Sequence, residues 1–156
     1  MPESPCAKPY GWAVDRNGAI ELLGRFHDAQ DAFYAGGPAD ALRDLLTEDV
    51  VWHVTGDNAI AGVYEGRAAV MAYFARRRDL SSRSFKMHPG DVLVGEGPRV
   101  AVLTDGSALM GGRERRWSTV GLYEFRGERV AACWLLPLDP QEFDAAWPSG
   151  ASSETV

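Results

Sequence analysis

The side chains that could carry out chemistry in this sequence are few and scattered. It contains no GxGxxG or P-loop nucleotide motif, no HExxH zinc motif, no CxxC pair and no GxSxG nucleophile elbow. The histidines His27, His53 and His88 have no acidic neighbours at metal-ligand spacing. The sequence therefore predicts a protein that holds no metal and works without a cofactor.

Three residues are candidates for proton transfer or hydrogen bonding to a ligand. Gln30 lies on the apolar stripe of a predicted helix, where its amide either meets a ligand oxygen or bonds to the backbone of the core. His88 lies in a predicted strand and, with an ordinary pKa of about 6.5, could exchange a proton; a surface position is the alternative. Tyr123 could donate to an oxyanion or could simply pack in the core.

The elements that position these residues are helices followed by strands. Apolar residues recur at helical spacing from residue 19 until Gly36-Gly37-Pro38 ends the helix; residues 39–46 and 67–80 form two more helices. Strands are predicted over 50–54, 85–94, 100–110, 114–125 and 130–136, with an irregularity at Pro89-Gly90 and a last helix over 139–147. On local rules alone, Asp105-Gly106 signals a hairpin turn. This order of elements favours an α+β fold.

Composition limits the class of protein. The 156 residues suit one domain over 19–147, between a leader over 1–18 and a tail over 148–156. A net charge of −6 disfavours nucleic acid, and the arginine clusters at 76–78 and 113–116 fit a solvated helix end and a solvated hairpin. No apolar run is long enough to cross a membrane, and no secretory signal is evident. Cys6 and Cys133 form no disulfide framework, so we expect a cytoplasmic protein.

Residues 45–74 carry a resemblance to a known family. The matching residues are the block Glu48-Asp49-Val50-Val51-Trp52-His53-Val54, the helix start Gly66-Arg67 and the pair Tyr73-Phe74. With these motifs in this order, the sequence resembles the nuclear transport factor 2-like superfamily, specifically its SnoaL-like and ketosteroid-isomerase-like enzymes of the polyketide cyclase type. The resemblance covers roughly residues 19–147.

The resemblance implies a cone-shaped α+β barrel, in which a strongly curved antiparallel sheet wraps around a long N-terminal helix and encloses a cavity. It also implies one long strand through Asp105-Gly106. Steroid isomerases of this fold use an Asp base with a Tyr and a protonated Asp as the oxyanion hole. The matching positions here are Val54, Gln30 or its neighbour, and Gly121, so that triad is missing.

Strand alternation indicates what replaces the triad. If Val54 and Gly121 face the cavity, alternate residues on their strands face it as well. The inward set on the strands then adds Trp52, Trp117, Thr119, Tyr123, Ala131, Cys133 and Leu135. We include Thr104 and Phe74 among the ligand-binding residues. His53 alternates with Val54 and so faces away from the cavity, and Asp105 also lies outside unless its strand bulges. Cys133 has no basic neighbour in the sequence, so it is more a packing residue than a nucleophile.

An aromatic, apolar cavity with neutral hydrogen-bonding groups suits an apolar, partly unsaturated ligand. We therefore expect a secondary-metabolism cyclase or isomerase that holds a polyketide-like substrate in a reactive conformation. The alternative is a non-catalytic ligand-binding or protein-interaction module of the same fold. The outward residues Val120, Leu122, Ala132, Trp134 and Leu136 predict a homodimer through the outer sheet face.

Gly121 carries a separate prediction. Glycine is unusual within a strand, and the resemblance places Gly121 where relatives carry a catalytic side chain. We expect the missing side chain to leave room for the ligand. Gly121→Leu would then block the cavity without a loss of stability.

Overall fold

The structure, a computed structural model, describes residues 15–150, which form four helices and six strands. In chain order they are α1 (Arg16–Tyr34), α2 (Asp40–Asp44), β1 (Leu46–Val54), β2 (Gly62–Glu65), α3 (Arg67–Leu80), β3 (Lys86–Val94), β4 (Arg99–Met110), β5 (Arg113–Arg126), β6 (Arg129–Pro137) and α4 (Pro140–Ala146). The predicted leader and tail fall largely outside the described residues, although α1 already begins at Arg16. No helix among residues 15–150 combines the length and the hydropathy that a bilayer crossing requires.

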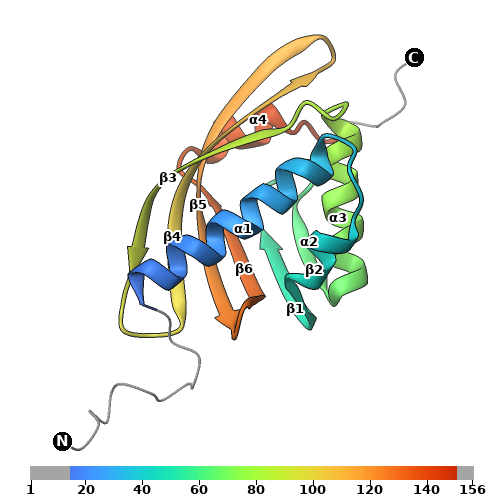
Figure 1. Ribbon diagram of the computed structural model, residues 1–156. Helices are drawn as coiled ribbons and strands as arrows, with labels where there is room; N and C mark the ends of the chain where they lie inside the picture. The colour runs from blue at the N-terminus through green and yellow to red at the C-terminus, as the bar shows by residue number, and fades with distance from the viewer. Residues whose placement is uncertain (1–14, 151–156) are drawn as a thin grey trace, which may run out of the picture.

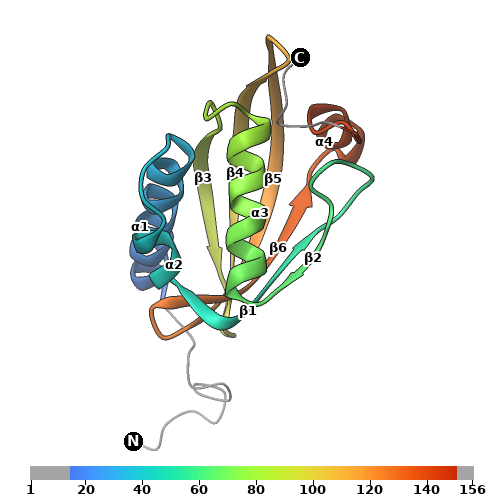
Figure 2. The same ribbon diagram turned by 90° about the vertical axis from the view of Figure 1, so that its right-hand side faces the viewer.

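All six strands form one curved sheet in the order β2-β1-β6-β5-β4-β3 (Figure 1). Helix α1 runs diagonally across its concave face, and α3 stands beside α1 against the β1 end of the sheet (Figures 1 and 2). The predicted cone-shaped α+β architecture is therefore confirmed. One strand pair departs from the expected antiparallel sheet, because β1 and β6 run parallel while the other four pairs are antiparallel. These two strands are far apart in the chain, so the long connection that a parallel pair needs is available.

Two irregular points of the sheet bear on the site. The register of β3 against β4 shifts between Pro89 and Val92, as the Pro89-Gly90 pair predicts. Asp105 and Gly106 pair with Ser118 and Trp117 inside the continuous strand β4, so the local hairpin signal is overridden. The long β4–β5 hairpin that results carries cavity residues from both strands.

Local sequence explains the ends of the two helices that carry site residues. Asp15 caps α1 by accepting a hydrogen bond from the Gly18 backbone N–H at 2.7 Å. Helix α3 begins after Gly66, whose φ of 89° is costly for any residue with a Cβ atom. The second helix is shorter than predicted, because Leu46 already belongs to β1.

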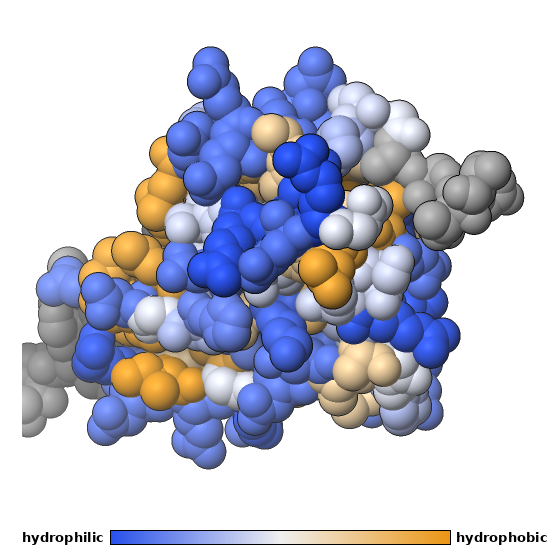
Figure 3. Space-filling view, turned by 90° about the horizontal axis from the view of Figure 1, so that it is seen from above, coloured by the Kyte–Doolittle hydropathy of each residue, from blue (hydrophilic) through white to orange (hydrophobic). Residues whose placement is uncertain are grey.

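The core lies between the helices and the concave face of the sheet, and it is rich in aromatic rings. Phe26 of α1 packs against Trp52 of β1, Phe74 of α3 and Tyr123 of β5, with ring centroids 5.9–6.3 Å apart. Seen from above, the molecule is covered mostly by hydrophilic side chains, with apolar atoms visible between them (Figure 3). The aromatic core therefore joins four elements around the region where the cavity lies.

Candidate active site

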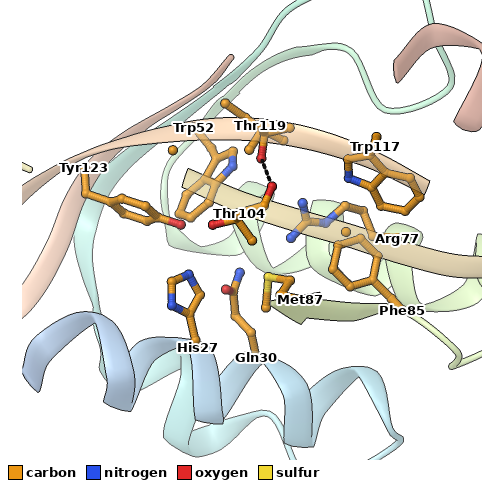
Figure 4. Close-up of a pocket in the computed structure, with 13 residues that line it drawn as sticks. His27, Gln30, Trp52, Arg77, Phe85, Met87, Thr104, Trp117, Thr119 and Tyr123 are labelled. Atoms are coloured by element: carbon orange, nitrogen blue, oxygen red, sulfur yellow. Dashed lines mark hydrogen bonds between the residues drawn. The ribbon is translucent and has the colours of Figure 1, made fainter. Parts of the chain in front are cut away.

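A cavity lies between α1 and the concave face of β1, β3, β4, β5 and β6 (Figure 4). It is lined by His27, Gln30, Trp52, Arg77, Phe85, Met87, Thr104, Gly106, Trp117, Thr119, Gly121, Tyr123 and Leu135. Eight of these residues are predicted from the sequence, namely Gln30, Trp52, Thr104, Trp117, Thr119, Gly121, Tyr123 and Leu135. Their gathering around one cavity makes it the candidate site.

The cavity is narrow. About 20 Å³ is open to the centre of a water molecule, which is room for about one water. A larger ligand therefore enters only when side chains of the wall move. Met87 is half-buried and unbranched, which makes it the most adaptable side chain of the wall.

Helix α1 contributes two polar side chains from one face. His27 and Gln30 are three residues apart, so both point toward the sheet (Figure 4). The pKa of His27 is lowered to about 4, mainly by burial; the neighbouring Asp28 raises it and Arg77 lowers it. His27 is therefore neutral at pH 7 and can accept a proton. The Gln30 side-chain oxygen is buried and has no hydrogen-bond partner among the described residues.

The sheet contributes hydrogen-bonding groups from the other side. Burial raises the pKa of Tyr123 well above its ordinary value, so its hydroxyl group keeps its proton. The Trp52 indole N–H is buried and has no acceptor within residues 15–150. Thr119 donates to the Thr104 carbonyl oxygen at 3.5 Å, the dashed line in Figure 4. The cavity thus offers both donors and acceptors within apolar walls.

The burial of Arg77 contradicts the prediction that residues 76–78 form a solvated helix end. Its side chain is 4% exposed, and its guanidinium group points into the cavity (Figure 4). Of the three arginines only Arg76 is exposed, because successive helix residues point about 100° apart. The cavity therefore contains a positive charge, and the expectation of purely neutral donors is wrong.

His88 also needs a correction. It pairs with Asp105 in the β3–β4 ladder, is exposed, and lines an open groove on the outside of the hairpin. Met87 takes the inward position instead, since side chains of a strand alternate between its two faces. His53 and Asp105 lie outside, as predicted: His53 stacks on Trp134 of the convex face, and Asp105 accepts from the Ser118 hydroxyl at 2.6 Å.

Three predicted ligand-binding residues belong to the core behind the cavity wall. Val54, Phe74 and Cys133 are buried, but they are not among the residues that line the cavity. Burial raises the pKa of the Cys133 thiol, which keeps it protonated and unreactive. Ala131, also predicted to face inward, lies where the β5–β6 register shifts, so simple alternation fails there.

Gly121 lines the cavity but does not provide the expected free space. A Cβ atom at this position would lie 2.7 Å from Cε2 of Tyr123 and 3.3 Å from its hydroxyl oxygen. The ring of Tyr123, packed against Phe26 and Trp52, occupies the room that Gly121 leaves. Gly106 has the same relation to Trp117, whose Nε1 would lie 2.4 Å from a Cβ atom. Both glycines let an aromatic side chain lie flat on the sheet.

The residues missed from the sequence follow the same periodicities as those found. His27 precedes Gln30 by one helical turn, and Arg77 follows Phe74 by the same spacing. Gly106 alternates with Thr104, and Phe85 alternates with Met87. Extending these periodicities from Gln30, Phe74 and Thr104 would have found His27, Arg77 and Gly106, whereas Phe85 and Met87 were missed because His88 was expected to face inward.

Comparisons with known proteins agree with this architecture. The family model of the SnoaL-like domain matches residues 25–133. Bal32a, from a soil-derived mobile gene cassette, is 26% identical, with a TM-score of 0.76 over 84% of this chain and 97% of that one. A candidate SnoaL-like polyketide cyclase from Jannaschia sp. CCS1 is 16% identical, with a TM-score of 0.69 over 96% and 98% of the two chains.

A third similar structure is that of TerC co-crystallised with polyporic acid, at 15% identity. Its TM-score is 0.67 over 83% of this chain and 97% of that one. At such low identity, TerC and the Jannaschia protein are evidence of a shared fold. None of the curated proteins matches the sequence of this chain.

Proposed function

Since this chain belongs to the SnoaL-like domain family, we propose that it is a small-molecule enzyme, a cyclase or isomerase that acts on an unsaturated, polyketide-like substrate in the cavity. Because one fold can host many different reactions, the residues of the cavity must indicate the chemistry. The similarity in fold to a candidate polyketide cyclase and to a protein co-crystallised with polyporic acid supports this substrate class.

The observation that carries the proposal is a neutral, buried histidine that shares a cavity with hydrogen-bond donors. His27 is 5% exposed, and its lowered pKa leaves it unprotonated at pH 7. Tyr123 stands edge-on to it, with ring centroids 6.2 Å apart. A group that can take a proton thus lies beside groups that can hold an oxygen anion, which is the arrangement that enolisation requires.

The proposed reaction begins with a ketone whose neighbouring carbon carries an acidic proton. That proton moves to the free nitrogen of His27, and the electron pair of the C–H bond forms an enolate. Tyr123, the Gln30 amide and the Trp52 N–H stabilise the enolate oxygen. In a cyclase, the enolate carbon then attacks a second carbonyl of the same substrate. In an isomerase, the enolate takes a proton at a different carbon. His27 returns its proton, and the aromatic walls hold the reactive conformation.

Proton exchange in D₂O tests this proposal without the natural substrate. We would follow the loss of the α-proton NMR signals of 2-tetralone, a fused-ring aromatic ketone. We expect exchange above the buffer rate with the wild type, and a loss of roughly 100-fold or more in His27→Asn. His53→Asn, which alters the convex face, is the matched control and should exchange at the wild-type rate. Full activity in His27→Asn would remove His27 from the mechanism.

A binding protein without catalytic activity is the second candidate, because the low pKa of His27 also makes it a weak base. Such a protein would bind 2-tetralone without accelerating exchange. Quenching of tryptophan fluorescence reports binding, since Trp52 and Trp117 line the cavity. Binding with no exchange would therefore favour this second function.

A further inference from the structure

Arg77 is a permanently charged side chain buried without a carboxylate partner. Its guanidinium carbon lies 4.8–5.6 Å from four ring centroids, those of Tyr34, Tyr73, Phe74 and Phe85. No Asp or Glu lines the cavity, and Arg77 forms no salt bridge with any residue in 15–150. Within the described part of the chain, its charge is offset by aromatic faces and by the hydroxyl group of Tyr34.

The fold does not need this charge. A buried cation is costly to desolvate, and cation–π contacts offset only part of that cost. Where buried charges have been replaced by apolar side chains of similar volume, stability is often unchanged or increased. A methionine would fill the same space between these rings. The arginine therefore calls for an explanation other than stability.

The hydrogen bonds of Arg77 leave one end of the guanidinium group open. Nε and Nη2 both donate to the hydroxyl oxygen of Tyr34, Nε at 3.1 Å. A guanidinium group has five N–H donors, and the remaining ones have no acceptor within residues 15–150. Tyr34 thereby fixes the near edge of the guanidinium plane, while the far end extends toward Thr104 in the cavity (Figure 4). Two parallel N–H donors in one plane are the geometry that binds a carboxylate.

Two further polar groups of the same cavity lack partners. The Trp52 indole N–H and the Gln30 side-chain oxygen are both buried and unbonded among the described residues. Buried polar groups are nearly always hydrogen-bonded in folded proteins. Three unsatisfied groups around one cavity point to a ligand that supplies an acceptor for Arg77 and Trp52 and a donor for Gln30.

We propose that the open end of the Arg77 guanidinium group binds the carboxylate of a planar, unsaturated substrate. The flat aromatic side chains Trp52, Phe85 and Trp117 would hold the unsaturated part, and the charge pair would set its orientation relative to His27. This inference rests on the proposed function in one respect only, namely that the cavity receives a small molecule. It adds that the substrate enters as an anion.

Benzoate and benzamide provide the test, because they have nearly the same shape and differ in charge. We would measure their dissociation constants by calorimetry and tryptophan fluorescence for the wild type, Arg77→Met, Arg77→Lys and Arg76→Met. The wild type should bind benzoate about tenfold or more tightly than benzamide. Arg77→Met should lose this preference, Arg77→Lys should keep part of it, and Arg76→Met, altered on the exposed side of the same helix, should keep all of it.

The outcomes separate this inference from the proposed function. Equal binding of benzoate and benzamide by the wild type would refute the anion site and leave the cavity as a small-molecule site. Binding of neither probe would refute both. A preference for benzoate that survives in Arg77→Met would place the anion elsewhere. If Arg77→Met fails to fold, the wild-type comparison decides, supported by the NMR titration of His27. Benzoate should raise the pKa of His27 by neutralising Arg77, and benzamide should not.

Discussion

Two arginines of this protein lie over aromatic rings on opposite faces of the same sheet. Arg99, on the convex face, lies 5.2 Å from the ring centroid of Trp134 and 3.6 Å from the Glu124 carboxylate. Arg77, on the concave face, has the aromatic contacts without the carboxylate. On the outer face, the charge of Arg99 is balanced by Glu124 in contact with solvent, where such ion pairs contribute little to stability. The inner face keeps a charge unbalanced where that is costly, as expected of a site completed by a ligand.

The two faces also differ in how their aromatic residues are covered. Trp52, Trp117 and Tyr123 are buried by the helices that cross the concave face. On the convex face, Trp134 stacks on His53 at 5.0 Å, and both remain half-buried. Helices α1 and α3 both lie on the other, concave side of the sheet (Figures 1 and 2). The aromatic residues of the inner face are thus enclosed, whereas those of the outer face remain partly open to solvent.

The largest effect should come from charging the outer face. We propose that Val120, Leu122, Trp134 and Leu136 pair with the same residues of a second copy, since Leu136 alone is 38% exposed and the others are half-buried. Light scattering at micromolar concentration should give twice the chain mass of 17.0 kDa. Leu122→Arg should reduce it to the chain mass. A wild type that is monomeric at that concentration would end the proposal.

Acid should destabilise the inner face through His27. The pKa of His27 is about 4 in the folded protein against 6.5 in the unfolded chain, so the folded state binds this proton less tightly. The contribution of neutral His27 is complete above pH 6.5 and is lost as the pH falls toward 4, by at most roughly 3 kcal/mol. Urea unfolding of the wild type between pH 7 and 4 should show this loss, and His27→Asn should show a flatter profile. Two parallel profiles would mean that His27 titrates normally.

Gly121→Leu should have a smaller effect on the same face. The new side chain must displace the ring of Tyr123, so we expect a loss of about 1–3 kcal/mol in the free energy of unfolding. Gly95→Leu is the matched control, because a Cβ atom at Gly95 meets nothing within 4 Å. Thermal unfolding of both variants gives the comparison. An unchanged melting temperature for Gly121→Leu would show that Tyr123 moves freely and that the cavity can widen.

Periodicity in the sequence was sufficient for most of the fold. The stop at Gly36-Gly37-Pro38, the alternation in β4 and β5, and the break at Pro89 all locate elements within a few residues of their observed ends. The parallel β1–β6 pair was not predictable in this way, because strand direction depends on which distant segments meet. Family resemblance was needed to keep Asp105-Gly106 inside a strand.

The residues of the site were predictable where alternation along a strand alone decides which face of the sheet a side chain lies on. Trp52, Thr119 and Tyr123 reach the cavity by alternation along their strands. Arg77 was missed because composition suggests that a run of three arginines is solvated, whereas the α3 helix turns only the middle one inward. Gly121 was misjudged because the space beside a glycine depends on its neighbours in three dimensions. Only the structure shows the Tyr123 ring there.

The central claim is that ligands bind on the inner face and not the outer one, and tryptophan indole NMR signals test it directly. The ¹H–¹⁵N indole signals would be assigned by single Trp→Phe variants and followed during titration with benzoate. We predict that the signals of Trp52 and Trp117 shift together with one saturation curve, while that of Trp134 stays in place. A saturable shift of Trp134 with no change at Trp52 and Trp117 would contradict the account.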